Sequence, residues 1–141
     1  MSLKGPVISI DDDADDQYLI QSMIEELKLP NELRLFQNGL QAHDYLLTTE
    51  ESPLLILCDM NMPVMNGLEL RNRIEENPYL KQKAIPFIFL TTSNDLGLIR
   101  QAYEGTIQGY FQKQNNFDTG KHQLELVIQY WKCCLHPNNS K

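Results

Sequence analysis

Acidic residues follow two short apolar runs that have the pattern of buried strands. The run 54–58 (Leu-Leu-Ile-Leu-Cys) leads directly into Asp59, and the run 7–10 (Val-Ile-Ser-Ile) leads into Asp11 and Asp12. A short apolar run bounded by turn residues is typical of a strand buried on both faces of a sheet. Open α/β sheets hold their sites at the carboxyl ends of such strands. Carboxylates brought into one crevice predict a site for a hard cation, beside which one of them could act as a nucleophile.

Two further apolar runs end in residues that could bind a phosphoryl group. The run 87–90 precedes Thr91, and the run 110–112 precedes Lys113. Neighbouring carboxylates repel one another unless a cation such as Mg2+ screens them. A carboxylate nucleophile can form an aspartyl phosphate, and the transition state then needs cations and donors on the equatorial oxygens. With Mg2+, the ammonium of Lys113 and the hydroxyl of Thr91, the set fits transfer of a phosphoryl group onto Asp59.

Strand and helix patterns alternate along the 141 residues, a length that fits one domain. The expected strands and helices alternate in chain order, as follows: strands over 7–10, 33–36, 54–59, 87–90 and 110–112; helices from about 13 to Pro30, over 40–47, from Asn66 to before Pro78, over 95–104 and through 124–135. Five such βα units with short connections predict an α/β fold with a parallel sheet and helices on both faces. Residues 136–141 have the composition of a frayed tail.

Composition and charge exclude several classes of protein. The net charge of −7 argues against a general nucleic-acid or membrane surface, which needs clustered Lys and Arg. No apolar stretch approaches the roughly 20 residues of a membrane span. The three cysteines, with Cys58 inside a core strand, favour a reducing cytoplasm over a disulfide scaffold. Cys133 and Cys134 are expected to pack at the end of the last helix.

These motifs together resemble the receiver domain of bacterial response regulators, of the CheY type. The resemblance runs from Val7 to about Trp131 and depends on four motifs that occur in order at strand ends. They are Asp11-Asp12, Asp59-Met-Asn-Met-Pro with Asn66-Gly67, Thr91, and Tyr110-Phe-Gln-Lys113. The resemblance implies a flavodoxin-like (βα)5 fold with strand order 2-1-3-4-5. It also implies one receiver domain over 1–141, with a core of about 5–132, a tail over 133–141 and no output domain.

The same resemblance implies a role for each acidic residue. Asp59 corresponds to the phosphoacceptor. Asp12 corresponds to a direct Mg2+ ligand, and Asp11 to a ligand that acts mainly through water. Asp59 and the backbone carbonyl of Asn61 complete the expected metal site.

A phosphorylation switch is implied as well. Thr91 and Lys113 correspond to the residues that bind the phosphoryl group. Tyr110 corresponds to the aromatic residue that turns inward when Thr91 moves, which changes the face formed by the fourth helix, the fifth strand and the fifth helix. The expected phosphoryl source is a sensor histidine kinase or a phosphotransfer protein, and the changed face would bind an unidentified protein partner. Trp131 leaves a homodimer through the last helix as a further alternative.

The chain departs from the family pattern at several positions. Gln114 follows Lys113 where the family usually has proline after a cis bond, and Thr106 replaces the usual glycine. A cis bond before a residue other than proline costs about 3 kcal/mol, so we expect a trans bond and a shifted Lys113. Three segments are similar to the small single-domain receivers associated with bacterial phytochromes. They are Thr91-Thr92-Ser93, Ala102-Tyr103 and Tyr130-Trp131.

Two other functions compete with that of a signalling phosphoacceptor. Phosphatases with an aspartyl nucleophile typically carry a second acid two residues later, where this chain has Asn61, which cannot transfer a proton. A scaffold that never uses the phosphoryl site is kept open by Gln114, although the complete set of acids, Thr91 and Lys113 argues against it. We therefore expect a signalling protein that assists its own phosphorylation and dephosphorylation rather than an enzyme.

Overall fold

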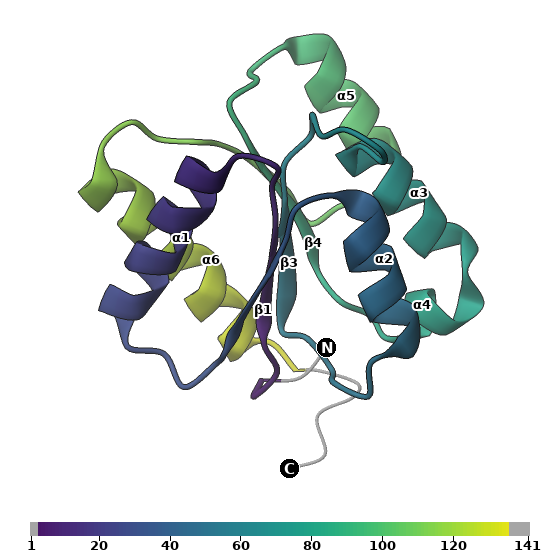
Figure 1. Cartoon of the computed structure of the whole chain (residues 1–141), viewed down its shortest axis with the longest axis horizontal. Coiled ribbons are helices and arrows are strands. Elements are labelled where there is room, and N and C mark those ends of the chain that lie inside the picture. The colour runs from purple at the N-terminus through teal and green to yellow at the C-terminus, as the bar shows by residue number, and fades with distance from the viewer. Residues whose placement is uncertain (1–2, 136–141) are drawn as a thin grey trace.

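The computed structural model describes residues 3–135, in which one parallel sheet lies between two layers of helices (Figure 1). The strand order is β2-β1-β3-β4-β5, and every neighbouring pair is parallel. The strands are β1 (Val7–Ile10), β2 (Leu33–Phe36), β3 (Leu55–Cys58), β4 (Phe87–Thr91) and β5 (Gly109–Gln112). The expected flavodoxin-like fold and its strand order are therefore confirmed.

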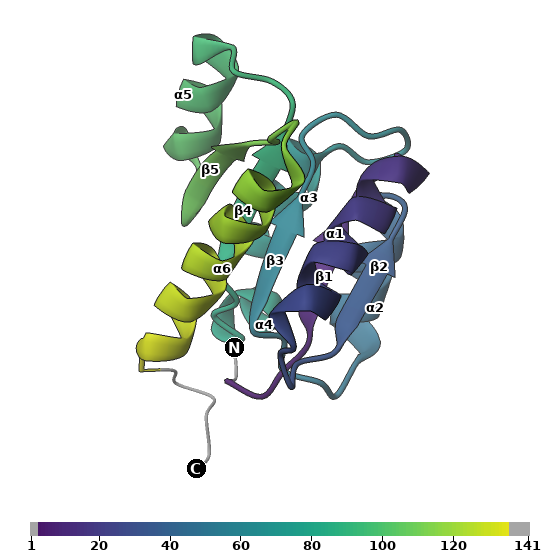
Figure 2. The same ribbon diagram turned by 90° about the vertical axis from the view of Figure 1, so that its left-hand side faces the viewer.

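Helices cover both faces of this sheet. They are α1 (Ala14–Leu27), α2 (Gly39–Thr48), α3 (Gly67–Glu76), α4 (Pro78–Gln82), α5 (Leu96–Glu104) and α6 (Phe117–Cys133). Helices α1 and α6 lie together on one face, and the other helices lie on the opposite face (Figures 1 and 2). The helices expected fourth and fifth from the sequence are α5 and α6, because the short α4 intervenes.

Helix α4 was missed by the sequence prediction, which placed nothing between Pro78 and the fourth strand. Asn77 ends α3 and begins α4: its backbone N–H donates to the carbonyl of Ile74, and its side chain accepts from the N–H of Leu80 at 3.2 Å. Pro78 suits the first position of a helix, where no N–H is needed. A helix of a single turn carries no periodic apolar pattern, so periodicity could not reveal it.

Alternation along the strands builds a core on each face of the sheet. In β1, Ile8 and Ile10 pack on the side of α2, α3, α4 and α5, whereas Val7 packs toward α1 and α6. Strands β1, β3 and β4 are buried along their whole length, while the edge strands β2 and β5 are only partly buried. The continuous apolar runs in the sequence thus mark the central strands, as expected for a parallel sheet.

Strand register brings the polar strand ends to one edge of the sheet. Ile10 pairs with Cys58, and the backbone N–H of Asp59 donates to the carbonyl of Ile10 at 2.9 Å. On the other side, the backbone N–H of Lys113 donates to the carbonyl of Thr91 at 2.8 Å. The residues that follow β1, β3, β4 and β5 therefore meet at a common carboxyl end.

Several local expectations are refined by the structure. Helix α1 ends at Leu27 with Lys28 in the left-handed region, so it stops before Pro30. Cys58 is buried as expected, but Cys133 is exposed, so the expected packing is wrong for Cys133 because it lies on the solvent side of α6. The tail over 136–141 falls outside the described residues. Within residues 3–135, no helix is long and apolar enough to cross a membrane.

Candidate phosphoacceptor and cation site

Asp59 lies at the end of β3 with its two carboxylate oxygens in different environments. Oδ1 accepts a hydrogen bond from the backbone N–H of Met60 at 2.8 Å. Oδ2 faces the ammonium of Lys113 at 3.7 Å, and the side chain is 12% exposed. The preceding residue, Cys58, is buried, and burial raises the pKa of its thiol, which stays protonated. Its Sγ lies 3.1 Å from the carbonyl oxygen of Asp59. Oδ2 is thus the oxygen that faces the cationic side chain of the site.

The turn after Asp59 returns close to its own beginning. The backbone N–H of Gly67 donates to the carbonyl of Met60 at 3.0 Å. A Cβ atom on Gly67 would lie 2.5 Å from the carbonyl oxygen of Asp59 and 2.6 Å from the ring of Phe89. Only glycine permits this approach, which explains why Asn66-Gly67 follows the acidic residue. Asn66 also forms a capping box with Glu69, and this holds the start of α3 in place.

Three carboxylates gather around the end of β1 and β3. Asp11, Asp12 and Asp59 can each offer one oxygen within 4.8 Å of the others. Asp11 is buried, Asp12 is exposed and Asp59 lies between these extremes. Burial raises the pKa of Asp11, although hydrogen bonds from Lys113 and the N–H of Asp13 oppose this. An all-oxygen set of carboxylates at this spacing fits a hard divalent cation such as Mg2+.

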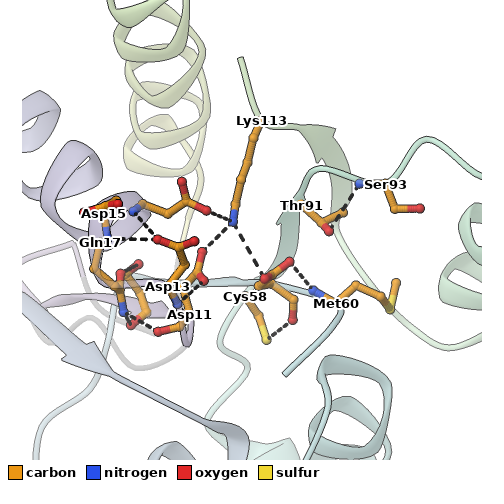
Figure 3. A network of polar contacts seen from close by, with 12 residues as sticks. Asp11, Asp13, Asp15, Gln17, Cys58, Met60, Thr91, Ser93 and Lys113 are labelled. Atoms are coloured by element: carbon orange, nitrogen blue, oxygen red, sulfur yellow. Dashed lines mark hydrogen bonds and ion pairs between the residues drawn. The ribbon is translucent and has the colours of Figure 1, made fainter. Parts of the chain in front are cut away.

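Lys113 reaches into this cluster from the end of β5 (Figure 3). Its Nζ lies 2.6 Å from Oδ2 of Asp11 and 2.7 Å from Oδ2 of Asp16, and its side chain is only 13% exposed. Burial alone lowers the pKa of Lys113, but the hydrogen bonds to Asp11 and Asp16 together raise it above its ordinary value. The side chain is therefore charged across the physiological range and partly neutralises the acidic cluster.

Thr91 and Tyr110 both act on the loop that leads from β4 to α5. Thr91 is fully buried, and its hydroxyl oxygen accepts from the backbone N–H of Ser93 at 3.5 Å. The hydroxyl of Tyr110 donates to the carbonyl of Ser93 at 3.0 Å, while its ring packs against Phe89 with centroids 5.9 Å apart. Burial raises the pKa of Tyr110, so the hydroxyl remains a donor. Ser93 thus links Thr91 and Tyr110, the two residues to which the family resemblance gives a role in a switch.

Two residues of α1 support the site and were not assigned to it from the sequence. Gln17 is buried, and its amide donates to the backbone carbonyls of Ser9, Asp11 and Phe36, at 3.2, 3.3 and 3.0 Å. Asp16 was expected only to favour the start of the helix, but it also pairs with Lys113. A polar residue on the buried face of α1 was the available signal for Gln17, whereas nothing local indicates the contact of Asp16.

Other expected site features have different outcomes. No cis peptide bond occurs among residues 3–135, so the expected trans bond between Lys113 and Gln114 is confirmed. Asp13 caps α1, accepting from the N–H groups of Asp15 and Asp16 at 2.9 and 3.1 Å. Asn61 is exposed in the turn after β3, and the role of its carbonyl as a metal ligand stays a prediction.

Comparison with known proteins shows that the chain is similar to receiver domains. A family profile described as response regulator receiver domain matches residues 7–125. Response regulator Rcp1 from Synechocystis is 28% identical over 130 residues, covering 89% of this chain and 87% of Rcp1. Sporulation initiation phosphotransferase F from Bacillus subtilis is 35% identical over 109 residues, covering 74% of this chain and 81% of that protein.

Solved structures extend the likeness to the whole fold. The phosphorylated cyanobacterial phytochrome response regulator RcpA superposes with a TM-score of 0.83 at 27% identity, covering 96% of this chain and 99% of that one. The Mn2+-bound form of Rcp1 gives a TM-score of 0.80 at 28% identity, covering 95% of this chain and 99% of that one. The similarity to phytochrome-associated receivers, expected from segments such as Tyr130-Trp131, is thereby confirmed.

Proposed function

Because the chain belongs to the response regulator receiver family, we propose that it accepts a phosphoryl group on Asp59 in a Mg2+-dependent reaction and signals through a changed surface. The observation that carries this proposal is the placement of Asp59 Oδ2, which faces Lys113 at 3.7 Å beside Asp11 and Asp12. A nucleophile, a cation-binding set and a fixed positive charge are the parts that phosphoryl transfer to a carboxylate requires.

The side chains divide the reaction between them. Oδ2 of Asp59 forms the new bond to phosphorus as the bond to the donor's leaving group breaks, while the Met60 N–H holds Oδ1. Asp11, Asp12, Asp59 and the carbonyl of Asn61 would hold Mg2+, which when bound supplies charge for the phosphoryl oxygens. The ammonium of Lys113 lies where it can meet one of these oxygens without leaving the site. After transfer, the hydroxyl of Thr91 would donate to another.

A change at Thr91 would reach the surface through the loop before α5. Thr91 and Tyr110 both hold Ser93, so a movement of the Thr91 side chain toward the phosphoryl group would weaken one of the two contacts on that residue. Because the Tyr110 hydroxyl donates to Ser93, Tyr110 would move together with this loop, and the face formed by α5, β5 and α6 would change. That face would bind the downstream protein partner. Helix α6 exposes Leu126 and Tyr130 there, and a homodimer through it stays a prediction.

The phosphoryl source in this proposal is a sensor histidine kinase or a phosphotransfer protein. Support comes from the relatives, which include a protein named as a phosphotransferase and a structure of a phosphorylated response regulator. The Mn2+-bound form of Rcp1 supports a divalent cation at the site. Turnover of small phosphate esters is not expected, because position 61 holds an asparagine rather than a second acid.

The test is intact-mass spectrometry after incubation with Mg2+ and acetyl phosphate. Wild-type protein is expected to gain one phosphoryl group, and Asp59→Asn to gain none while keeping its fold, because an amide cannot act as this nucleophile. Asp15→Asn is the matched control: it removes an exposed acid next to the site and should label like wild type.

Stable labelling of Asp59→Asn at another residue would contradict the assignment of the phosphoacceptor. If no variant gains mass, binding of fluoroberyllate with Mg2+ decides the next step. Wild-type protein that binds the analogue retains a working site and needs a protein donor. If wild-type protein does not bind fluoroberyllate, the result would favour a scaffold that binds its partners constitutively.

A further inference from the structure

Lys113 has a second carboxylate partner that lies outside the candidate cation site. Oδ2 of Asp16 is 2.7 Å from Nζ, essentially as close as Oδ2 of Asp11 at 2.6 Å. Asp16 is not one of the three acids that can share a cation. It stands in the first turn of α1, 97 positions away from Lys113 in the chain. The ammonium therefore bridges the start of α1 and the end of β5.

Asp11 has two competing partners in the proposed function. In this structure its Oδ2 is engaged by Lys113 and its Oδ1 by the backbone N–H of Asp13 at 3.0 Å. A cation held by Asp11 would weaken the first of these bonds. An ammonium that is only 13% exposed is costly to leave without a counter-charge. A second carboxylate partner that does not bind the cation, such as Asp16, would keep the ammonium of Lys113 paired when Asp11 binds the cation.

Asp16 is itself held in place. Its backbone N–H donates to the capping carboxylate of Asp13 at 3.1 Å, and its side chain is 31% exposed, so its ion pair is only partly screened. Lys113 has no proline after it to restrict the backbone, since Gln114 occupies that position. The ion pair of Nζ with Asp16 can then restrain the Lys113 side chain at its tip, where a proline after Lys113 would have restrained its backbone.

We propose that Asp16 is a positioning residue that keeps Nζ of Lys113 beside Asp59 when Asp11 turns to a cation. This inference rests on the proposed function and extends it to a residue outside the cation site. The ammonium of Lys113 keeps one hydrogen bond to Asp16 and can direct another N–H toward Oδ2 of Asp59, which lies 3.7 Å from Nζ. Lys113 would thus be oriented before the phosphoryl group arrives rather than recruited by it.

A double-mutant cycle between Asp16 and Lys113 tests the proposal. Isothermal titration calorimetry measures the dissociation constant for Mg2+ in wild type, Asp16→Asn, Lys113→Ala and the double variant. It then measures the dissociation constant for fluoroberyllate at saturating Mg2+. Asp16→Asn is expected to weaken both by about threefold to tenfold, the range for losing one restraint on a long side chain. In the Lys113→Ala background this effect should shrink to that of a general charge change.

Asp15→Asn measures the general charge effect. Asp15 lies in the same turn of α1 and is exposed, and its carboxylate makes no hydrogen bond or ion pair within residues 3–135. Asp16→Glu should restore most of the lost affinity, because it keeps a carboxylate within reach of Lys113. Thermal unfolding of each variant establishes that the proteins compared are folded.

The outcomes of these measurements distinguish failure of the role proposed for Asp16 from failure of the proposed phosphoacceptor function. Equal weakening by Asp16→Asn with and without Lys113 would overturn the inference, since Asp16 would then act only through its charge. The same holds if Asp16→Asn matches Asp15→Asn. In both cases phosphorylation of wild type by acetyl phosphate would leave the proposed function standing. Wild-type protein that binds no Mg2+ and accepts no phosphoryl group would overturn both.

Discussion

At the scale of single residues, the site is organised around one positive charge. Lys113 contacts Asp11 and Asp16 closely and Asp59 at longer range, and its burial keeps these contacts out of bulk water. Charge-assisted hydrogen bonds of this kind are stronger than neutral ones. The lysine therefore holds together acids that would otherwise repel one another. Its ammonium also faces Oδ2 of Asp59, the oxygen to which we assign phosphoryl transfer.

Replacing Lys113 by alanine should separate cation binding from switching. We expect Lys113→Ala to retain Mg2+ binding, because the carboxylate ligands remain and lose a competing cation. We expect its affinity for fluoroberyllate to fall by about tenfold or more, the loss expected for one charge-assisted hydrogen bond. Amide NMR spectra recorded with Mg2+ and fluoroberyllate should then lack the shifts in α5, β5 and α6 that wild type shows.

Lys121→Ala provides the control for that experiment. Lys121 lies on α6, and its ammonium pairs with Glu26 of α1 at 3.0 Å rather than with an acid of the candidate site. It should respond to the analogue like wild type. Normal partner binding by phosphorylated Lys113→Ala would refute the role of Lys113 in switching.

At the scale of elements, the start of α3 packs directly against the turn that carries Asp59, the proposed phosphoacceptor. Gly67 is the first residue of this helix, and the carbonyl of Asp59 and the ring of Phe89 occupy the space where a side chain would begin. The close approach couples the turn after β3 to β4, where Phe89 is completely buried. The position of Asp59 therefore depends on a helix that contributes no group to the chemistry.

Gly67→Ala should disturb both stability and phosphoryl acceptance. We expect a loss of about 1–3 kcal/mol in the free energy of unfolding, typical of overpacking, because backbone atoms cannot yield as a flexible side chain does. Gly105→Ala is the matched control: its new Cβ would meet only the carbonyl of Ala102 at 3.5 Å, so we expect a change within about 0.5 kcal/mol. Urea unfolding and the rate of labelling by acetyl phosphate measure the two effects. Equal stability of the two variants would contradict the packing argument.

At the scale of the whole molecule, repulsion among the clustered carboxylates destabilises the folded state, and a bound cation would relieve this repulsion. Folding brings Asp59 to the adjacent pair Asp11 and Asp12 from a distant segment of the sequence, and an unfolded chain does not hold the three acids at this spacing. A ligand that binds only the folded state raises the free energy of unfolding by mass action. The stability of the protein should therefore report on its cation site.

Mg2+ should raise the unfolding free energy of wild type by about 2.7 kcal/mol at one hundred times its dissociation constant. Asp12→Asn should be at least as stable as wild type without Mg2+, because one repulsive charge is gone, and should gain little when Mg2+ is added. Asp15→Asn should gain as much as wild type. Thermal or urea unfolding with Mg2+ and with a chelator measures these differences, and an equal gain in Asp12→Asn would remove Asp12 from the proposed metal ligands.

The sequence alone was sufficient for the sheet and for the group of candidate site residues that meet at its carboxyl edge. Apolar runs such as 54–58 are local patterns that depend on burial, and parallel strands necessarily bring their carboxyl ends to one edge. The acids at positions 11, 12 and 59, and the lysine at position 113, could therefore be assigned together before any contact was known. The strand order and the family, which the resemblance to receiver domains implied, were confirmed together with the expected α/β fold.

Only the tertiary structure revealed how those residues are held. The pairing of Asp16 with Lys113 depends on where α1 stands relative to β5, and no local pattern contains that distance. The hydrogen bonds of Gln17 to backbone carbonyls of β1 and β2, and the exposure of Cys133, depend likewise on packing. Periodicity records which face of an element is buried, whereas contacts between polar side chains are set by the relative placement of elements. The sequence therefore determined which groups stand at the strand ends, and the fold decided which further polar side chains contact them.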